Sequence, residues 1–404
     1  MTEHTNTLLG IFPKKIEELK KDGLYRSFVP FSHLATERGH AVHGADDGVG
    51  DGAGRVQVWC SNDYLGLSQH PEVIRAQLDS TVEHGTGSGG SRNIAGTSAA
   101  HVELETRLAA WHGKERALVF SSGYIANFET LSTVISALPG IVVFSDAKNH
   151  RSLIEGILRT GCAKHIFPHN DLDELERALA QYDHDRPKLI VFETVYSMDG
   201  DVSPVRAICD LAERYNALTF VDETHAVGTR GPTGAGVCEE AGENRPTFVQ
   251  GVFSKAFGTV GGYVAGPDAA LDYVRSHAPG FIFTTSLPHS SLDATLRSLE
   301  LIQDGDALRR ALADNVRHLK QALQAAGIGF LDADSHLVPV LVPGAEHVRR
   351  VARVLFEEHD VYVTPINFPS VPRGAERFRI TVPPFRTSGQ IDDFVVALRK
   401  SLDS

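Results

Sequence analysis

The chain has 404 residues, of which 42% are hydrophobic, and a formal net charge of −12. This length exceeds one ordinary core, so we expect a large domain and a smaller one. The acidic charge and the absence of a long basic run argue against a nucleic-acid partner. Because no run of about 18 apolar residues occurs, we also expect no membrane span and no membrane partner.

The cysteines and histidines indicate the cellular compartment of the protein and whether to expect a metal site. Cys60, Cys162, Cys209 and Cys238 are scattered and form no CxxC pair. This usage fits reduced thiols in a cytoplasmic protein better than a disulfide framework or a zinc site. His165 and His169 have HxxxH spacing, but the intervening Pro168 opposes the helix that would align them. We therefore expect no metal.

Short apolar strands alternate with amphipathic helices through most of the chain. A polar helix is expected over residues 14–24, and a later one begins at Pro204 with Ser203 as its cap. Expected strands cover 117–121, 141–144, 188–192, 218–221 and 248–253. This alternation predicts an α/β fold with a mostly parallel central sheet, helices on both faces, and ligands at the carboxyl ends of the strands.

The pattern changes from about residue 290, where a helical stretch of about 290–327 precedes strands over 337–342, 361–363 and 378–381. We interpret this part as a smaller α+β domain. The expected division is an N-terminal arm and small-domain segment at 1–55, a large catalytic domain at 56–290, and the C-terminal small domain at 291–404.

The main chemical signal is a lysine and an aspartate at the ends of two expected strands. One strand ends at Asp222, and another ends just before Ser254 and Lys255. Pyridoxal phosphate (PLP) needs a lysine to bind its aldehyde and a carboxylate to keep its ring nitrogen protonated. His225 lies three residues after the aspartate, within reach of the ring oxygen. A PLP enzyme with Lys255 and Asp222 as catalytic residues is predicted.

Three further positions suit the same cofactor and an amino-acid substrate. Gly123 follows Ser122 between a strand and a helix, where free backbone N–H groups bind phosphate. His150 follows another strand and is suited to stacking on the ring. Arg379 lies between Phe378 and Ile380 and is expected to point away from their apolar face, toward a substrate carboxylate. A capped helix, a structural histidine and a solvated arginine are the simpler interpretations of each position alone.

Three segments resemble the α-oxoamine synthases, PLP enzymes of fold type I that condense an amino acid with an acyl-CoA and release CO2. They are residues 58–66 (VWCSNDYLG), 85–97 (GTGSGGSRNIAGT) and 196–200 (YSMDG). Four others resemble the 5-aminolevulinate synthase branch: 92–94, 150–156, 281–288 and 366–374. The resemblance spans about residues 10–400 and implies the fold of aspartate aminotransferase, a homodimer, and glycine and succinyl-CoA as substrates.

The resemblance also implies a set of site residues. The cofactor would be held by Gly123, Tyr124, His150, Ser197, Asp222, His225 and Lys255, with Thr284 and Thr285 supplied by the neighbouring subunit. His150 would also take part in catalysis, and Lys255 would be the proton-transfer base. The substrates would be bound by Asn62 and Arg379 at the glycine carboxylate, by Ser145 and Lys164 at CoA, and by Arg26, Ser91, Asn93, Ile94 and Ser370 around the terminal carboxylate of the acyl chain.

The chain departs from the family pattern at a few positions, which leaves alternatives open. Val252 stands where a threonine usually binds the phosphate, and Ser91 and Ser370 stand where this branch usually has threonine. Loss of two methyl groups widens the expected acyl pocket. The alternatives are a sister synthase (2-amino-3-ketobutyrate ligase, 8-amino-7-oxononanoate synthase or serine palmitoyltransferase type), an aminotransferase, or a non-catalytic partner subunit. The intact Lys255, Asp222 and His225 argue against the last.

Overall fold

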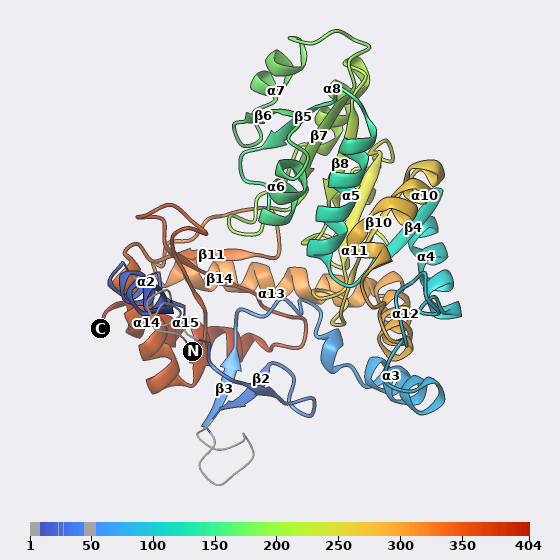
Figure 1. The fold of residues 1–404 in the computed structure, drawn as a ribbon. Coiled ribbons are helices and arrows are strands. Elements are labelled where there is room, and N and C mark those ends of the chain that lie inside the picture. The colour runs from blue at the N-terminus through green and yellow to red at the C-terminus, as the bar shows by residue number, and fades with distance from the viewer. Residues whose placement is uncertain (1–8, 23, 27, 44–53) are drawn as a thin grey trace.

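The computed structural model describes residues 9–22, 24–26, 28–43 and 54–404 (Figure 1). Its central element is a seven-stranded sheet in the order β4-β10-β9-β8-β7-β5-β6. The strands are β4 (Arg116–Phe120), β5 (Val142–Asp146), β6 (Ala163–Phe167), β7 (Lys188–Glu193), β8 (Leu218–Asp222), β9 (Phe248–Val252) and β10 (Gly262–Gly266). The strands from β9 to β6 are parallel, and β10 runs antiparallel to β4 and β9. This arrangement confirms the predicted mostly parallel sheet.

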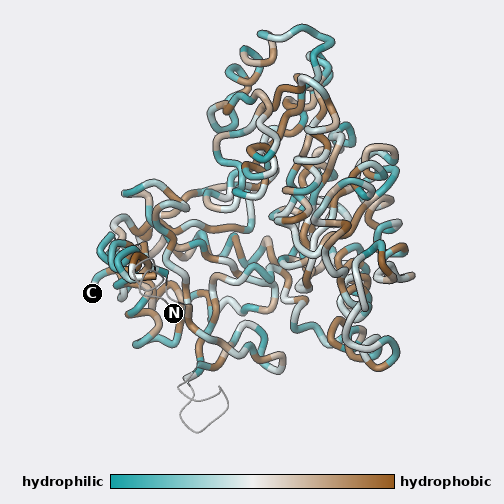
Figure 2. Tube along the Cα trace, in the orientation of Figure 1, coloured by the Kyte–Doolittle hydropathy of each residue, from teal (hydrophilic) through white to brown (hydrophobic). Residues whose placement is uncertain are grey.

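Helices cover both faces of this sheet because its strands are apolar on both sides. On one face, Val142 and Phe144 pack with α4 (Ala99–Trp111), α7 (Leu172–Leu179) and α8 (Val205–Arg214). On the other, Val143 packs with α5 (Gly123–Ala137), α6 (Arg151–Leu158) and α10 (Asp268–His277). Figure 2 shows hydrophobic residues concentrated along the central strands and hydrophilic residues on the outer turns.

Two smaller sheets lie apart from the central one. One has the order β1-β2-β3-β12 and joins the N-terminal part of the chain to its C-terminal part, since β3 pairs parallel with β12. The other has the order β11-β14-β13 and is antiparallel. Their strands are β1 (Ser32–His33), β2 (His40–His43), β3 (Gly54–Val58), β11 (Val338–Leu341), β12 (Val361–Tyr362), β13 (Pro365–Ile366) and β14 (Arg377–Ile380).

The remaining helices complete the two halves of the molecule. α12 packs on α3, and α15 packs on α13 and α14 (Figure 1). Besides α4–α8 and α10, the described helices are η1 (Leu67–Gln69), α2 (Ile11–Lys21), α3 (Pro71–His84), α9 (Val237–Glu240), α11 (Pro279–Ile282), α12 (His289–Gln303), α13 (Asp306–Ala325), α14 (Ala345–His359) and α15 (Ser388–Leu402). Among the described helices, none is both long and apolar enough to cross a bilayer.

Three sequence predictions need correction. The helical stretch of 290–327 is two helices, because the chain leaves α12 at Asp304 and starts α13 after Gly305. Ser203 is not the cap of α8: the cap position is Pro204, and the Ser203 hydroxyl donates to the Glu193 carbonyl oxygen, 2.7 Å away. The first helix lies at 11–21 and not 14–24. The proposed domain boundaries stay a prediction.

Candidate active site

The site forms where neighbouring parallel strands end. β7, β8 and β9 lie side by side, and Glu193 and Asp222 are register partners at the ends of β7 and β8. Lys255 follows β9 by three residues. Because parallel strands bring their carboxyl ends to one edge of the sheet, these three side chains gather there. The order of strands in the sequence therefore places the aspartate and the lysine together.

Asp222 is a buried carboxylate with a fixed orientation. It is 3% exposed and accepts hydrogen bonds of 2.8 Å from the Asn127 side-chain amide and from the Thr224 backbone N–H. The same amide group donates to the Ser152 hydroxyl at 3.0 Å, which ties α5 to α6. Asn127 was not predicted, because nothing in the sequence of α5 marks it as facing a carboxylate.

Lys255 is an amine without a partner. It makes no hydrogen bond or ion pair with any residue that the structure describes. Burial lowers its pKa to about 8, while the charge of Asp222 opposes this shift and that of Arg379 adds to it. At a pKa of about 8, roughly a tenth of the amine is neutral at pH 7, far more than for an exposed lysine, and the neutral form is what a nucleophile or a base requires.

His225 is joined to the motif at 58–66 through a tyrosine. Its Nδ1 lies 2.7 Å from the Tyr64 hydroxyl, which also donates to Asn62 Oδ1 at 3.2 Å. Burial, with Lys255 and Arg379 nearby, holds the pKa of His225 well below its usual value, so the imidazole is neutral. His336 packs edge-on against Tyr64 with a ring-centre distance of 4.2 Å. Neither Tyr64 nor His336 was predicted, although Tyr64 lies within the motif.

Arg379 and Asn62 meet as a pair. Arg379 Nη2 donates to Asn62 Oδ1 at 2.6 Å, and Nη1 donates to the Ser197 carbonyl oxygen at 3.1 Å. Phe378 and Ile380 on either side are buried in the core, so the arginine points the other way, as its place in the strand predicts. Arg379, Asn62 and Ser197, which were predicted from distant segments, thus come together near Lys255.

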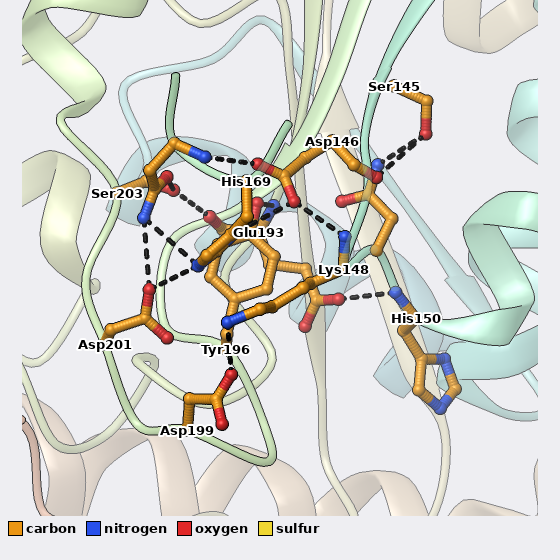
Figure 3. Close-up of polar contacts among 12 residues, drawn as sticks. Ser145, Asp146, Lys148, His150, His169, Glu193, Tyr196, Asp199, Asp201 and Ser203 are labelled. Carbon is orange, nitrogen blue, oxygen red and sulfur yellow. Dashed lines mark hydrogen bonds and ion pairs between the residues drawn. The ribbon is translucent and has the colours of Figure 1, made fainter. Parts of the chain in front are cut away.

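His150 begins α6 at the same edge of the sheet. Its Nδ1 lies 2.8 Å from the Ser152 hydroxyl, and its backbone N–H donates to Glu193 Oε1 at 2.5 Å. Figure 3 shows its ring extending away from the Glu193 carboxylate. Burial, with Asp222 beside it, raises the pKa of Glu193 well above its usual value, which favours the protonated acid. Burial lowers the pKa of His150, so its ring is neutral and suited to stacking.

A polar network supports this edge from behind (Figure 3). His169 Nδ1 lies 2.9 Å from Asp146 Oδ1, and Nε2 lies 2.5 Å from Asp201 Oδ2. Burial lowers the pKa of His169, but the two carboxylates outweigh this effect and raise the pKa of His169 to about 9. Asp199 pairs with Lys148 and with Arg377 of β14. Contacts at Asp199 and Asp201 therefore hold the loop that carries Ser197.

The predicted phosphate turn lies between β4 and α5. Ser122 caps the helix by accepting from the Ile125 N–H at 3.2 Å, so Gly123 and Tyr124 are the first helical residues, whose N–H groups have no acceptor in a preceding turn. A Cβ added at Gly123 would lie 2.1 Å from Val252 Cγ1. Free donors, a buried carboxylate and an unpartnered lysine together fit PLP: the phosphate, the ring nitrogen and the aldehyde each find a suitable group.

Other predicted residues lie outside this cluster. Ser145 is 1% exposed within β5, where its hydroxyl accepts from the Asn149 amide at 2.8 Å. Arg26 and Ser370 are exposed, as is Lys164 on the edge strand β6. Ser91 and Thr285 form an antiparallel β-bridge between their two segments. Asn93 and Ile94 nearby are exposed, and Thr284 is half-buried. The roles of these residues stay predictions.

Comparisons with known proteins agree with this geometry. The model of aminotransferase class I and II matches residues 55–398. The 5-aminolevulinate synthase 2 of Cereibacter sphaeroides is 47% identical over 389 residues, 96% of this chain and 95% of that protein. The enzyme of Bradyrhizobium diazoefficiens named 5-aminolevulinate synthase is 43% identical over 393 residues, 97% of this chain and 95% of that protein. The chain belongs to the α-oxoamine synthase family, in its 5-aminolevulinate synthase branch.

The solved structures give the same family. Serine palmitoyltransferase (SPT) with PLP is 29% identical, with a TM-score of 0.88, and the match covers 96% of each chain. PLP is therefore the cofactor, and the fold is that of fold type I enzymes. The predicted cofactor and fold are both confirmed.

Proposed function

We propose that the protein condenses glycine with succinyl-CoA to give 5-aminolevulinate, CoA and CO2. Relatives named 5-aminolevulinate synthase at 43% and 47% identity over nearly the whole chain support this reaction. The observation that carries the proposal is the unpartnered Lys255 amine, with a pKa of about 8, beside the anchored Asp222 and the Arg379–Asn62 pair.

Bound PLP supplies an electron sink that acidifies the α-proton of glycine and supports loss of CO2. Asp222 would keep the ring nitrogen protonated, and its bonds to Asn127 and Thr224 fix the carboxylate for that task. His225 and Ser197 would bind at the ring oxygen, and His150 would cover one face of the ring. Gly123 and Tyr124 would bind the phosphate through their N–H groups.

Lys255 would act twice, first by holding the cofactor and then by moving protons at Nζ. Its lowered pKa suits it to remove a proton from the glycine α-carbon near neutral pH and later to return one to the product. The Arg379 guanidinium and Asn62 would hold the glycine carboxylate. Arginine suits this role because it offers two parallel N–H donors.

The succinyl end of the substrate would be recognised by Arg26, Ser91, Asn93, Ile94 and Ser370, and CoA by Ser145 and Lys164. These residues are not gathered around Lys255 within one chain. A homodimer with shared sites would reconcile their positions with their roles, and in it Thr284 and Thr285 would reach the phosphate of the neighbouring subunit. Exposed apolar side chains on and next to these segments support such an interface: Ile94 at 67%, Phe283 at 83% and, on α3, Val82 at 89%.

We also propose a cytoplasmic location. All four cysteines are free thiols, as in proteins of reducing compartments. Cys209 and Cys238 are buried, and burial raises the pKa of both, which makes them unreactive.

An acyl-CoA panel tests the substrate assignment. The PLP-loaded enzyme is given glycine with succinyl-, acetyl-, malonyl-, glutaryl- and octanoyl-CoA in parallel, and both free CoA and the amino ketone are quantified. We expect turnover with succinyl-CoA at least 100-fold above the other esters. Turnover with glutaryl-CoA at a similar rate would move the function to a sister synthase, a result that the smaller side chains of Ser91 and Ser370 would explain. An α-keto acid formed without CoA release would indicate an aminotransferase.

A further inference from the structure

Three metal-binding side chains gather away from the catalytic cluster, at the junction of α3 and α12. His84 is the last residue of α3, and His289 and Asp293 lie in the first turns of α12. One ligand atom from each of the three lies within 4.8 Å of the others, and among the described residues this is the one such group of three or more. The sequence did not reveal it, because His84 is distant in the chain from the other two.

One polar atom of this cluster lacks the partner that a buried polar atom normally has, while His84 is exposed at the end of α3. His289 Nδ1 is buried without a hydrogen bond. The Asp293 carboxylate, in a half-buried residue, makes no hydrogen bond or ion pair with any described residue. The Arg297 guanidinium, one turn further along α12, is taken by Glu72 and Glu300 and so does not neutralise Asp293. A buried polar atom without a partner, as at His289 Nδ1, points to a missing ligand.

Favourable packing between the two histidine rings does not by itself explain this arrangement. The rings of His84 and His289 lie 4.3 Å apart at 46°, which suits neither face-to-face nor edge-on packing. By contrast, His318 Nε2 lies 2.8 Å from Asp392 Oδ1, so this histidine and carboxylate hydrogen-bond directly to each other. At the α3–α12 junction the carboxylate remains free of both rings.

The ligand set and its spacing fit a small divalent ion of borderline softness. Histidine and aspartate at positions i and i+4 of one helix share a face. With one further histidine they give the three-ligand nitrogen and oxygen set that Zn²⁺ accepts, with water as its fourth ligand. The ligand atoms lie within 4.8 Å of one another. In a tetrahedral site with Zn–N and Zn–O bonds of about 2.0–2.2 Å, neighbouring ligand atoms lie about 3.4 Å apart, so the side chains would have to move closer together on binding. Glu83, 3.9 Å from His84 Nε2, adds negative charge nearby.

The junction adjoins two segments that belong to the proposed substrate and cofactor site. The segment after α3 carries Ser91, and the segment before α12 carries Thr285, which is its bridge partner. Ser88 Oγ donates to the Ser286 carbonyl oxygen at 2.9 Å, and Ser286 Oγ donates to the Gly96 carbonyl oxygen at 2.6 Å. The first segment begins where α3 ends, and the second ends where α12 begins, so an ion at the junction would fix one end of each segment. Figure 1 shows α3 and α12 as neighbours.

We propose that His84, His289 and Asp293 bind a divalent transition metal ion of the zinc class, which clamps the end of α3 to the start of α12. The ion has a structural role: it takes no part in the chemistry at Lys255. It stabilises the folded protein by mass action, because the unfolded chain does not present the three ligands together.

The test is a Zn²⁺ titration of the tag-free, PLP-loaded enzyme in chelator-free buffer, with affinity and stoichiometry measured by competition with a chromophoric chelator. We expect one Zn²⁺ per chain, a rise in Tm of several degrees, and a loss of affinity of at least 10-fold in each of His84→Ala, His289→Ala and Asp293→Asn. The matched control His318→Ala should bind as the wild type does. Equal affinity in His84→Ala and the wild type would overturn the proposal.

Two features keep the test decisive. His84 is exposed at a helix end, so His84→Ala is expected to fold with the wild-type Tm when zinc is absent, even if His289→Ala does not fold. Substitution of Co²⁺ separates this site from the cysteines: visible bands without a near-ultraviolet thiolate band support a histidine and carboxylate site. A thiolate band would assign the metal to cysteine, and binding that survives in all three variants would assign it to another site; either result would contradict the proposal.

Discussion

Arg379 on β14 donates a hydrogen bond of 2.6 Å to Asn62, which follows β3, and so the pair joins the two smaller sheets beside Lys255. Because arginine binds a carboxylate with paired donors, Arg379→Lys should raise the KM for glycine about 10- to 100-fold. Asn62→Ala should raise it less. The KM for succinyl-CoA should change by less than about 3-fold in both, and Arg399→Ala, an exposed arginine paired with Asp403, should match the wild type. A larger effect on succinyl-CoA than on glycine would contradict the assignment.

The lowered pKa of Lys255 has a direct kinetic consequence. The amine reacts with the cofactor aldehyde only in its neutral form, so the rate at which apoenzyme becomes covalently loaded with PLP should rise with pH around a midpoint near 8. An exposed lysine would give a midpoint near its usual value of about 10.4. Stopped-flow absorbance of loading between pH 6.5 and 10 measures this midpoint. Lys255→Ala should bind PLP without the covalent absorbance and show no turnover.

Tyr64→Phe should separate cofactor positioning from folding. The substitution removes the hydroxyl 2.7 Å from His225 Nδ1 and leaves the buried imidazole unpaired, at a cost of about 1–3 kcal/mol. We expect kcat to fall about 10-fold and the pH titration of the bound cofactor's absorbance to shift. Tyr263→Phe is the matched control, since that hydroxyl lies 2.8 Å from His112 in another buried tyrosine–histidine pair. It should lower stability to a similar extent but leave the absorbance titration unchanged.

His169 should make the stability of the protein depend on pH. Its folded-state pKa of about 9 exceeds the usual value of about 6.5 because Asp146 and Asp201 hold the proton. This stabilisation is fully present below pH 6.5 and is lost as pH rises through 9. The stability difference between the wild type and His169→Gln, measured by urea unfolding, should therefore be about 1–3 kcal/mol at pH 6 and shrink by pH 10. A difference that stays constant with pH would rule out the linkage.

Val252→Thr should strengthen PLP binding. Val252 Cγ1 lies against Gly123 in the proposed phosphate turn, and threonine has nearly the same shape but adds a hydroxyl. A new hydrogen bond to a charged phosphate favours binding by about 1.5 kcal/mol, so the dissociation constant should fall about 10-fold. Equilibrium dialysis of the apoenzyme measures it. Val249→Thr, on the same strand, is the control. An unchanged or weaker constant in Val252→Thr would show that the hydroxyl does not reach the phosphate.

Features that depend on local order along the chain could be predicted from the sequence. The strand ends carrying Asp222 and Lys255 and the turn at Ser122 were identified because apolar runs, caps and breaks lie within a few residues of one another. The partners of these residues could not be identified in this way. Asn127 looks like any polar residue of α5, and Tyr64 meets His225 only through tertiary packing. At Ser203 the local pattern predicts a helix cap, but the structure differs, because the hydroxyl donates a hydrogen bond to the Glu193 carbonyl oxygen instead.

The most direct test of the account follows the carboxyl carbon of glycine. PLP-loaded enzyme is given succinyl-CoA and glycine labelled at its carboxyl carbon, and labelled CO2, free CoA and 5-aminolevulinate are quantified over time. The account predicts equal amounts of all three products, with no label in the 5-aminolevulinate and no turnover by Lys255→Ala. Label retained in the product, CO2 released without CoA, or turnover by the Lys255→Ala variant would contradict it.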